Sequence, residues 1–205
     1  MINKKRGALS CCVAPSTACH PTLTPPLPLL PAPLSLSLSL SLSLSSPRQC
    51  KTLCLENTRA REPVGPFAPD HLAALPPPAR AALARFFLVI VQYTARLDTE
   101  ALAKGLRAAS GGAAPAKAFN LRLAPEEESA ALTGYEHNAV TPIGVAGVAD
   151  GAVPLILAAA ISTLTPPLFW MGGGEVDLKL GVDTAAFVRA YKPIVTDVTV
   201  PAGDE

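Results

Sequence analysis

The sequence FLVIVQY, residues Phe87 to Tyr93, is an uncharged run of β-branched and aromatic residues. Such a run is typical of a strand that is buried within a sheet. Upstream, CKTLCLEN, residues Cys50 to Asn57, predicts a second strand. Its side chains would divide between two faces, with Thr52, Cys54 and Glu56 on one and Leu53 and Leu55 on the other.

Three helices are predicted from their boundary residues. Asp98 can cap a helix that runs to about Ala109, before Gly111 and Gly112. Pro125, followed by three Glu residues, begins a helix that Gly134 ends. Asp183 or Thr184 caps a last helix through Tyr191, which Pro193 prevents from continuing.

Further strands are expected at Phe119–Leu123, Val153–Ala158, Glu175–Leu180 and Ile194–Val200. The third of these has an alternating pattern, with apolar residues at Val176, Leu178 and Leu180 and charged residues at Glu175, Asp177 and Lys179, which predicts one buried face. Lys179 lies on the charged face and is expected to be an ordinary solvated side chain. The breaker-rich segment Arg59–Pro78 is expected to be a loop, Ala79–Arg85 a short helical turn and Gly147–Gly151 a turn. Because strands and helices intermix without regular βαβ spacing, the sequence predicts a mixed α+β sheet that curls around a core, and not a doubly wound fold.

Residues 1–47 are low in complexity, with a Pro-rich tract at 21–33 and a strict Leu-Ser alternation at 34–44. We expect this extension to be disordered and residues 48–205 to form the folded domain. Translation of a CT dinucleotide repeat gives such an alternation, so a mistaken or recently acquired coding extension is one hypothesis. An organellar presequence is the other, since Lys4, Lys5 and Arg6 precede an uncharged, Ser-rich stretch. The expected location is therefore the cytoplasm, or an organelle under the second hypothesis.

Composition excludes several functions. The net charge is +1, and without residues 1–47 the chain has 14 basic and 16 acidic residues, so strong sequence-independent nucleic-acid binding is not expected. The five Cys all lie between positions 11 and 54, and neither a CxxC pair nor a His pair at zinc-ligand spacing is present. No metal and no cofactor are predicted. The longest apolar runs are too short for a membrane span.

Two Gly-rich loops are the candidate functional segments. LTGYEHNAVTPIG, residues Leu132 to Gly144, is a short non-periodic segment that can present main-chain N–H groups to a ligand. For His137 and Asn138 the residues alone favour plain loop capping. In FWMGGG, the triple Gly precedes a predicted strand and not a helix, so a tight turn is favoured over a phosphate site. No GxSxG motif and no partner for a hydrolase triad are present.

Five segments, in this order over residues 50–199, resemble the YbaK-type, prolyl-tRNA-synthetase-associated editing domains, particularly the eukaryotic branch. They are KTLCLEN, LVIVQYTARL, LTGYEHNAVTPIG, FWMGGGEVDLKLG and VTDVT. The resemblance implies a mixed, partly closed sheet flanked by helices. It also implies that the chain acts in trans and hydrolyses mischarged aminoacyl-tRNA, with a tRNA(Pro)-type substrate expected. The partner would be the 3′ acceptor end of aminoacyl-tRNA, with a synthetase as a further partner. Lys51 matches the pocket lysine of the family. The implied substrate-binding residues are Gly134, His137, Asn138, Thr141, Pro142, Gly144, Gly172, Gly173 and Gly174.

The chain departs from the family at two places. Bacterial members commonly have Gly-Gly where this chain has His137-Asn138, which predicts a different pocket width. The family also has a helix and early strands before the KTL strand, where this chain has the low-complexity segment, so one pocket wall is expected to be incomplete. Two alternatives therefore stand beside the deacylase: an inactive module that binds tRNA or a synthetase, and a truncated, non-functional product.

Overall fold

The computed structural model describes residues 46–201, which lie in one compact unit. The low-complexity extension falls outside the described residues, apart from positions 46 and 47. Strand β1 (Cys50–Asn57) and strand β2 (Phe86–Gln92) confirm the two strands that the opening motifs predict, and they pair antiparallel. They are the centre of a five-stranded sheet with the order β4-β1-β2-β5-β8, where β4 is Leu121–Leu123, β5 Leu155–Ala158 and β8 Ile194–Thr196.

The sheet is mixed, because β2 pairs with β5, and β5 with β8, in parallel, whereas β1 pairs antiparallel with β2 and β4. Two further pairs are separate from it: β3 (Ala95–Leu97) with β9 (Thr199–Pro201), and β6 (Leu168–Gly172) with β7 (Lys179–Asp183). This arrangement confirms the predicted mixed α+β class and excludes a doubly wound sheet.

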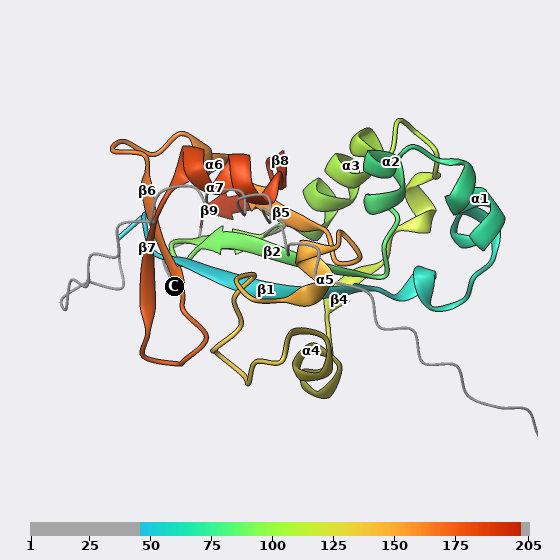
Figure 1. Ribbon diagram of the computed structural model, residues 1–205. Helices are drawn as coiled ribbons and strands as arrows, with labels where there is room; N and C mark the ends of the chain where they lie inside the picture. Colours follow the sequence, from blue (N-terminus) through green and yellow to red (C-terminus); the bar gives the residue numbers. More distant parts are fainter. Residues whose placement is uncertain (1–45, 202–205) are drawn as a thin grey trace, which may run out of the picture. The chain divides into compact units, whose positions relative to one another are not determined.

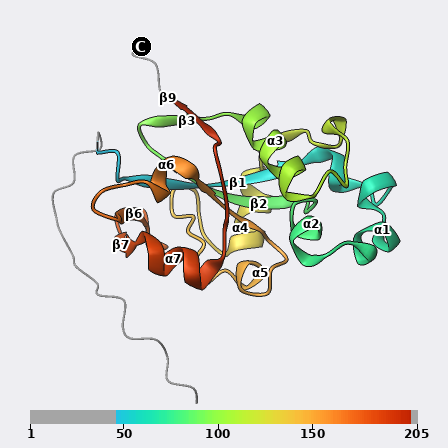
Figure 2. The same ribbon diagram turned by 90° about the horizontal axis from the view of Figure 1, so that it is seen from above.

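Helices cover both faces of the sheet. Figure 1 shows α3 (Thr99–Ala109), α6 (Ala159–Ser162) and α7 (Thr184–Tyr191) on one face and α4 (Glu126–Thr133) on the other. In Figures 1 and 2, α1 (Pro69–Ala74) and α2 (Pro77–Ala81) lie together at one end, and the β6–β7 hairpin lies at the other. Short helical turns occur at η1 (Thr58–Arg61), η2 (Gly65–Phe67), η3 (Ala116–Ala118) and α5 (Ala146–Ala149).

The predicted caps are confirmed. The Asp98 carboxylate accepts from the N–H groups of Glu100 and Ala101, and Asp183 accepts from that of Ala186. Gly134 ends α4 with φ 77°, a left-handed conformation in which glycine is favoured.

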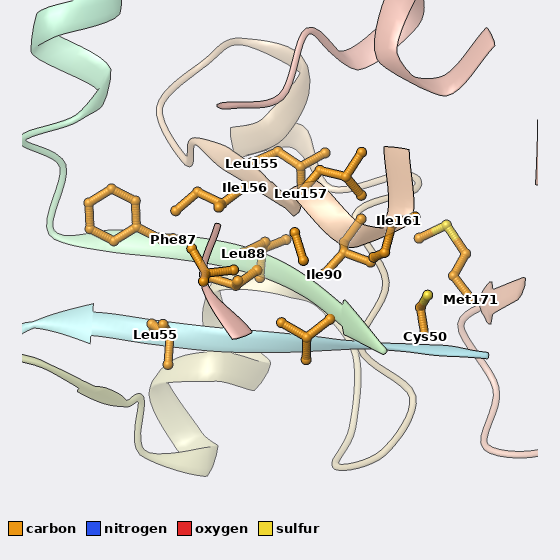
Figure 3. Packing of buried hydrophobic residues seen from close by; sticks show 14 of the residues in the cluster. Cys50, Leu55, Phe87, Leu88, Ile90, Leu155, Ile156, Leu157, Ile161 and Met171 are labelled. Atoms are coloured by element: carbon orange, nitrogen blue, oxygen red, sulfur yellow. The ribbon is translucent and has the colours of Figure 1, made fainter. Parts of the chain in front are cut away.

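The main core lies between the sheet and the helices on the α3 side. Strand β2 supplies five consecutive residues that are fully shielded from solvent, Phe87 to Val91. Figure 3 shows Phe87, Leu88 and Ile90 packing with side chains of β5, with Ile161 and with Met171 of β6. Because β2 lies in the interior of the sheet and other elements cover both faces of the sheet, its residues are buried on both faces, as its continuous apolar sequence predicts.

Several predicted boundaries are wrong. Glu175–Leu180 is not one strand: Gly173 N–H donates to the Leu178 carbonyl (3.0 Å), which makes residues 174–178 a turn, and β7 begins only at Lys179. The expected strand Ile194–Val200 divides into β8 and β9, which belong to different sheets. The predicted loop Arg59–Pro78 contains η1, η2 and α1, and α2 begins at its end, because prolines at helix starts allow short helices.

Candidate functional site

A pocket of about 340 Å³ lies along one edge of β1. Five consecutive residues of that strand line it, Cys50 to Cys54. The remaining lining residues come from the end of β2, from β4 and α4, from the loop after α4 and from the β6–β7 hairpin: Tyr93, Leu123, Ala124, Glu126, Ser129, Tyr135, His137, Asn138, Val140, Gly172 and Lys179.

The pocket exists because β1 lacks a complete neighbour on this edge. At one end, Gln49 makes an isolated parallel bridge with Trp170, and at the other, Leu55–Asn57 pairs with β4. Between these contacts, no strand among residues 46–201 pairs with the pocket edge of β1. An unpaired strand edge presents main-chain donors and acceptors that a ligand can use.

Thr52 is the residue whose main chain points at this gap. The N–H of Tyr93 donates to the Gln49 carbonyl (2.9 Å) and Asn57 N–H donates to that of Arg85 (2.7 Å), so the odd-numbered residues exchange bonds with the β2 side. In an antiparallel ladder, the main-chain N–H and C=O groups of the intervening, even-numbered residues point to the other edge of the strand. The Cys54 carbonyl does so, accepting from Ala124 N–H (2.9 Å). The Thr52 hydroxyl is also buried and has no hydrogen-bond partner in the described structure.

Tyr135 joins the two Gly-rich loops that the sequence singles out. Its hydroxyl donates to the Ile143 carbonyl (2.6 Å), which closes the loop after α4 on itself. Its ring lies where a side chain at Gly174 would be, with Cε1 2.9 Å from the position of a Cβ. In addition, a Cβ at Gly172 would lie 3.3 Å from the Val140 carbonyl oxygen. The two loops therefore form one continuous wall.

The structure brings four of the predicted site residues into the pocket: Lys51, His137, Asn138 and Gly172. The other six do not line it. Thr141 and Pro142 are buried behind the wall, and Gly134, Gly144, Gly173 and Gly174 shape the backbone of the two loops.

Asn138 has φ 65°, in the left-handed region. Asn adopts this conformation more readily than other side chains that carry a Cβ, and Gly adopts it without penalty. The backbone therefore explains why Asn, and equally Gly, is suited to this position. The side chain also reaches the pocket, because Asn138 is one of its lining residues.

Two pocket residues that the sequence did not predict are Tyr93 and Lys179. The ammonium of Lys51 lies 5.7 Å from the centre of the Tyr93 ring, and that of Lys179 lies 5.8 Å from it. Lys179 was expected to be an ordinary solvated side chain, and the structure places this half-buried side chain among the residues that line the pocket. The adjacency depends on the pairing of Lys179 with Gly172, which sequence spacing does not reveal.

The pocket thiols are protonated at neutral pH. Burial raises the pKa of Cys50 to about 12. Burial also raises the pKa of Cys54, against the opposing effect of a hydrogen bond with Ser129. A thiolate is the reactive form of cysteine, so neither residue is suited to act as a nucleophile.

A buried carboxylate anchors the wall that α4 forms. Glu56 is fully shielded and accepts from Arg61 (2.6 Å), Arg85 (2.8 Å) and Arg122 (3.1 Å). Arg85 also bonds Glu128 of α4 (2.9 Å). This network links α4, which carries pocket residues Glu126 and Ser129, to β1, β2 and β4. The arginines, led by Arg61, hold the pKa of Glu56 at about 2, below its ordinary 4.5.

Within residues 46–201, no group of three or more His, Cys, Asp or Glu side chains is placed to hold a metal ion. No helix in this part of the chain is both long and apolar enough to cross a membrane.

The fold and the pocket agree with one family. The sequence model of one protein family, the aminoacyl-tRNA editing domain, matches residues 79–190, which is more than half of the 205 residues. The chain belongs to this family, as the sequence motifs predict. Lys51 lies upstream of the matched residues, so its assignment depends on the KTL motif and on its place in the pocket.

Solved structures share this fold. The crystal structure of "hypothetical protein APE2540" superimposes with a TM-score of 0.52 at 17% identity, over 82% of this chain and 92% of that chain. A protein with the provisional assignment of trans-editing enzyme for prolyl-tRNA synthetase superimposes with a TM-score of 0.50 at 18% identity, over 75% of this chain and 71% of that chain. At these identities the likeness establishes the fold alone. No curated protein matches the chain significantly.

Proposed function

We propose that this chain is an aminoacyl-tRNA deacylase that hydrolyses the ester of a mischarged tRNA in trans, with tRNA(Pro) carrying a wrong amino acid as the substrate. Membership of the editing family supports the reaction class. The structural neighbour assigned to prolyl-tRNA synthetase editing is the reason for choosing tRNA(Pro). The observation that carries the proposal is the position of Lys51, on an unpaired strand edge inside a pocket that both Gly-rich loops border.

The chemistry suits these groups. A water molecule adds to the ester carbonyl carbon and gives up one proton, and negative charge develops on the carbonyl oxygen. The bond to the terminal ribose oxygen then breaks as that oxygen takes up the proton that the water has lost. An aminoacyl ester is already activated, so positioning and charge stabilisation are sufficient. Lys51 supplies the positive charge at the oxyanion. The main-chain N–H of Thr52 faces the unpaired edge of β1 and can donate to the same oxygen.

The protonated thiols of Cys50 and Cys54 support direct attack by water over a covalent enzyme intermediate. The substrate's own ribose hydroxyl can orient that water. The pocket volume of about 340 Å³ is at the low end for ligand sites, which favours a small aminoacyl group. A pocket of this kind discriminates one methylene by only about 1–3 kcal/mol, so the amino acid must be found by assay.

The test is hydrolysis of tRNA(Pro) charged with Ala, Cys or Ser, using the full chain. We expect at least one ester to be cleaved, and Lys51→Ala to lower kcat about 100-fold or more, the usual cost of losing one oxyanion donor. Lys104→Ala, an exposed lysine of α3, makes the same charge change away from the pocket and should leave the rate unchanged. Undiminished turnover by Lys51→Ala would remove this lysine from the mechanism. Binding of tRNA without any turnover would favour the inactive-module alternative.

We also propose a cytoplasmic location, because the substrate class is met in translation; an organellar location follows if residues 1–47 act as a presequence. Imaging the chain with and without these residues separates the two, since only a presequence changes the location when removed.

A further inference from the structure

One aromatic ring holds two cations at the mouth of the pocket. The ring of Tyr93, at the end of β2, is 38% exposed, and both Lys51 and Lys179 place their ammonium groups within 6 Å of its centre. The two lysines come from different parts of the fold, β1 and β7. An ammonium at this distance is attracted to the ring face, which restricts two otherwise flexible side chains.

Neither ammonium is neutralised. Within residues 46–201, neither Lys51 nor Lys179 forms an ion pair or a side-chain hydrogen bond. Glu126 is the only carboxylate among the pocket-lining residues. Residues 48–205 have more acidic than basic residues, so two unpaired cations beside one pocket are a local departure from the charge of the domain. Such a site attracts an anion.

The two lysines have different surroundings. Lys51 lies within the run Cys50 to Cys54 that forms the pocket edge of β1, next to Thr52, whose main chain faces the unpaired edge. Lys179 is the first residue of β7 and follows Glu175 to Asp177, three exposed residues at the turn of the hairpin. Lys51 is therefore the lysine beside the main-chain donor of the strand edge, and Lys179 the one beside the exposed turn.

We propose that Lys179, held by Tyr93, binds the 5′-phosphate of the terminal nucleotide of the substrate, and that Lys51 is thereby left to the ester carbonyl. The inference rests on the proposed function, since it assigns the parts of one nucleotide ester to the two lysines. In that nucleotide the ester and the 5′-phosphate are separated by a single ribose, and both ammonium groups lie within 6 Å of the centre of one aromatic ring, so one nucleotide can reach both. Tyr93 is a positioning residue, and Lys179 contacts the substrate.

The first test is binding of AMP and of adenosine, measured by NMR titration of the full chain. We expect AMP to bind about tenfold more tightly than adenosine, in keeping with one charge-assisted hydrogen bond. Lys179→Ala and Lys179→Gln should abolish this preference, Lys179→Arg should retain it, and Lys104→Ala should not change it. Tyr93→Leu should weaken the preference and Tyr93→Phe, which keeps the ring, should preserve it. Thermal melting of each variant shows that it is folded.

The second test compares hydrolysis of 3′-O-alanyl adenosine with that of 3′-O-alanyl AMP. Lys179→Ala should raise KM about tenfold for the phosphate-bearing ester alone, with little change in kcat, whereas Lys51→Ala should lower kcat for both esters. For intact tRNA, the slope of log affinity against log salt should fall by about 1 in Lys179→Ala.

The outcomes separate the two proposals. Equal affinity of the wild type for AMP and adenosine, or a preference that survives in both Lys179→Ala and Lys179→Gln, would overturn the inference even if the esters are hydrolysed. Conversely, a preference lost in these variants supports the phosphate site even if no ester is cleaved, in which case it is the deacylase activity that fails.

Discussion

The ring of Tyr135 occupies the space that a side chain at Gly174 would need, with Cε1 2.9 Å from the position of a Cβ there. The same tyrosine donates to the Ile143 carbonyl (2.6 Å). One side chain thus fixes the loop after α4 against the β6–β7 hairpin, and the pocket wall depends on both. Gly174 is required twice, for this contact and for its φ of 98°.

We expect Gly174→Ala to destabilise the protein by roughly 2–3 kcal/mol, through a left-handed backbone and the clash with Tyr135. Gly112→Ala is the matched control, because Gly112 has φ 79° and nothing lies within 4 Å of its Cβ position. This control should cost about 1 kcal/mol. Chemical unfolding of both variants gives the difference, and equal losses would show that Tyr135 moves aside freely.

Asn138 gives a second test of backbone conformation, at a pocket residue. With φ 65°, replacement by Gly should change the free energy of unfolding by only a few tenths of a kcal/mol, whereas Asn138→Ala should cost about 1 kcal/mol. Urea unfolding of the pair measures this. If Ala were tolerated as well as Gly, the left-handed conformation would not be a constraint at this position.

The part of the fold that follows local rules was predictable from the sequence. Helix α3 begins after Asp98 and α4 ends at Gly134, since a cap depends on residues within one turn. Strand β2 was predictable because a strand buried on both faces has a continuous apolar sequence. The strand predicted over Glu175–Leu180 was wrong. Its alternating pattern is compatible with a strand, but the hydrogen bond between Gly173 and Leu178 makes a turn there.

The candidate site was predictable only where a motif marks it. Lys51, His137, Asn138 and Gly172 were found through the KTL strand and the two loops. Tyr93 and Lys179 were missed because their proximity depends on the β1–β2 pairing, on the bridge between Gln49 and Trp170, which are far apart in sequence, and on the register of the β6–β7 hairpin.

Glu56 was expected on a strand face with Thr52 and Cys54, but it is fully buried among three arginines. We expect Glu56→Gln to destabilise the protein by about 1.5–3 kcal/mol at pH 7, because the charge-assisted hydrogen bonds of a buried anion are weakened while the three arginines remain partly exposed to solvent. Glu127→Gln, an exposed residue of α4, makes the same charge change and should be nearly neutral. A neutral Glu56→Gln would mean that the arginines find equivalent partners in solvent.

Acid stability follows from the same group. The folded-state pKa of Glu56 is about 2, below the ordinary 4.5, so the folded state holds its charge more strongly than the unfolded state does. Its contribution is complete above about pH 4.5 and is lost as the pH falls toward about 2. The free energy of unfolding of the wild type should therefore fall more steeply over this range than that of Glu56→Gln. Parallel curves would show that Glu56 does not cause the acid sensitivity.

Thr52 should show opposite effects on stability and on activity. Its hydroxyl is buried on the pocket edge without a partner in residues 46–201, so Thr52→Val removes an unsatisfied polar group and should leave the free energy of unfolding unchanged or raise it by up to about 1 kcal/mol. If the hydroxyl donates to the ester carbonyl, the same variant lowers kcat about 100-fold, and Thr52→Ser, which keeps the donor, retains most of it. Loss of stability in Thr52→Val would instead indicate that the hydroxyl is bonded within the protein, and unchanged kcat would remove it from the reaction.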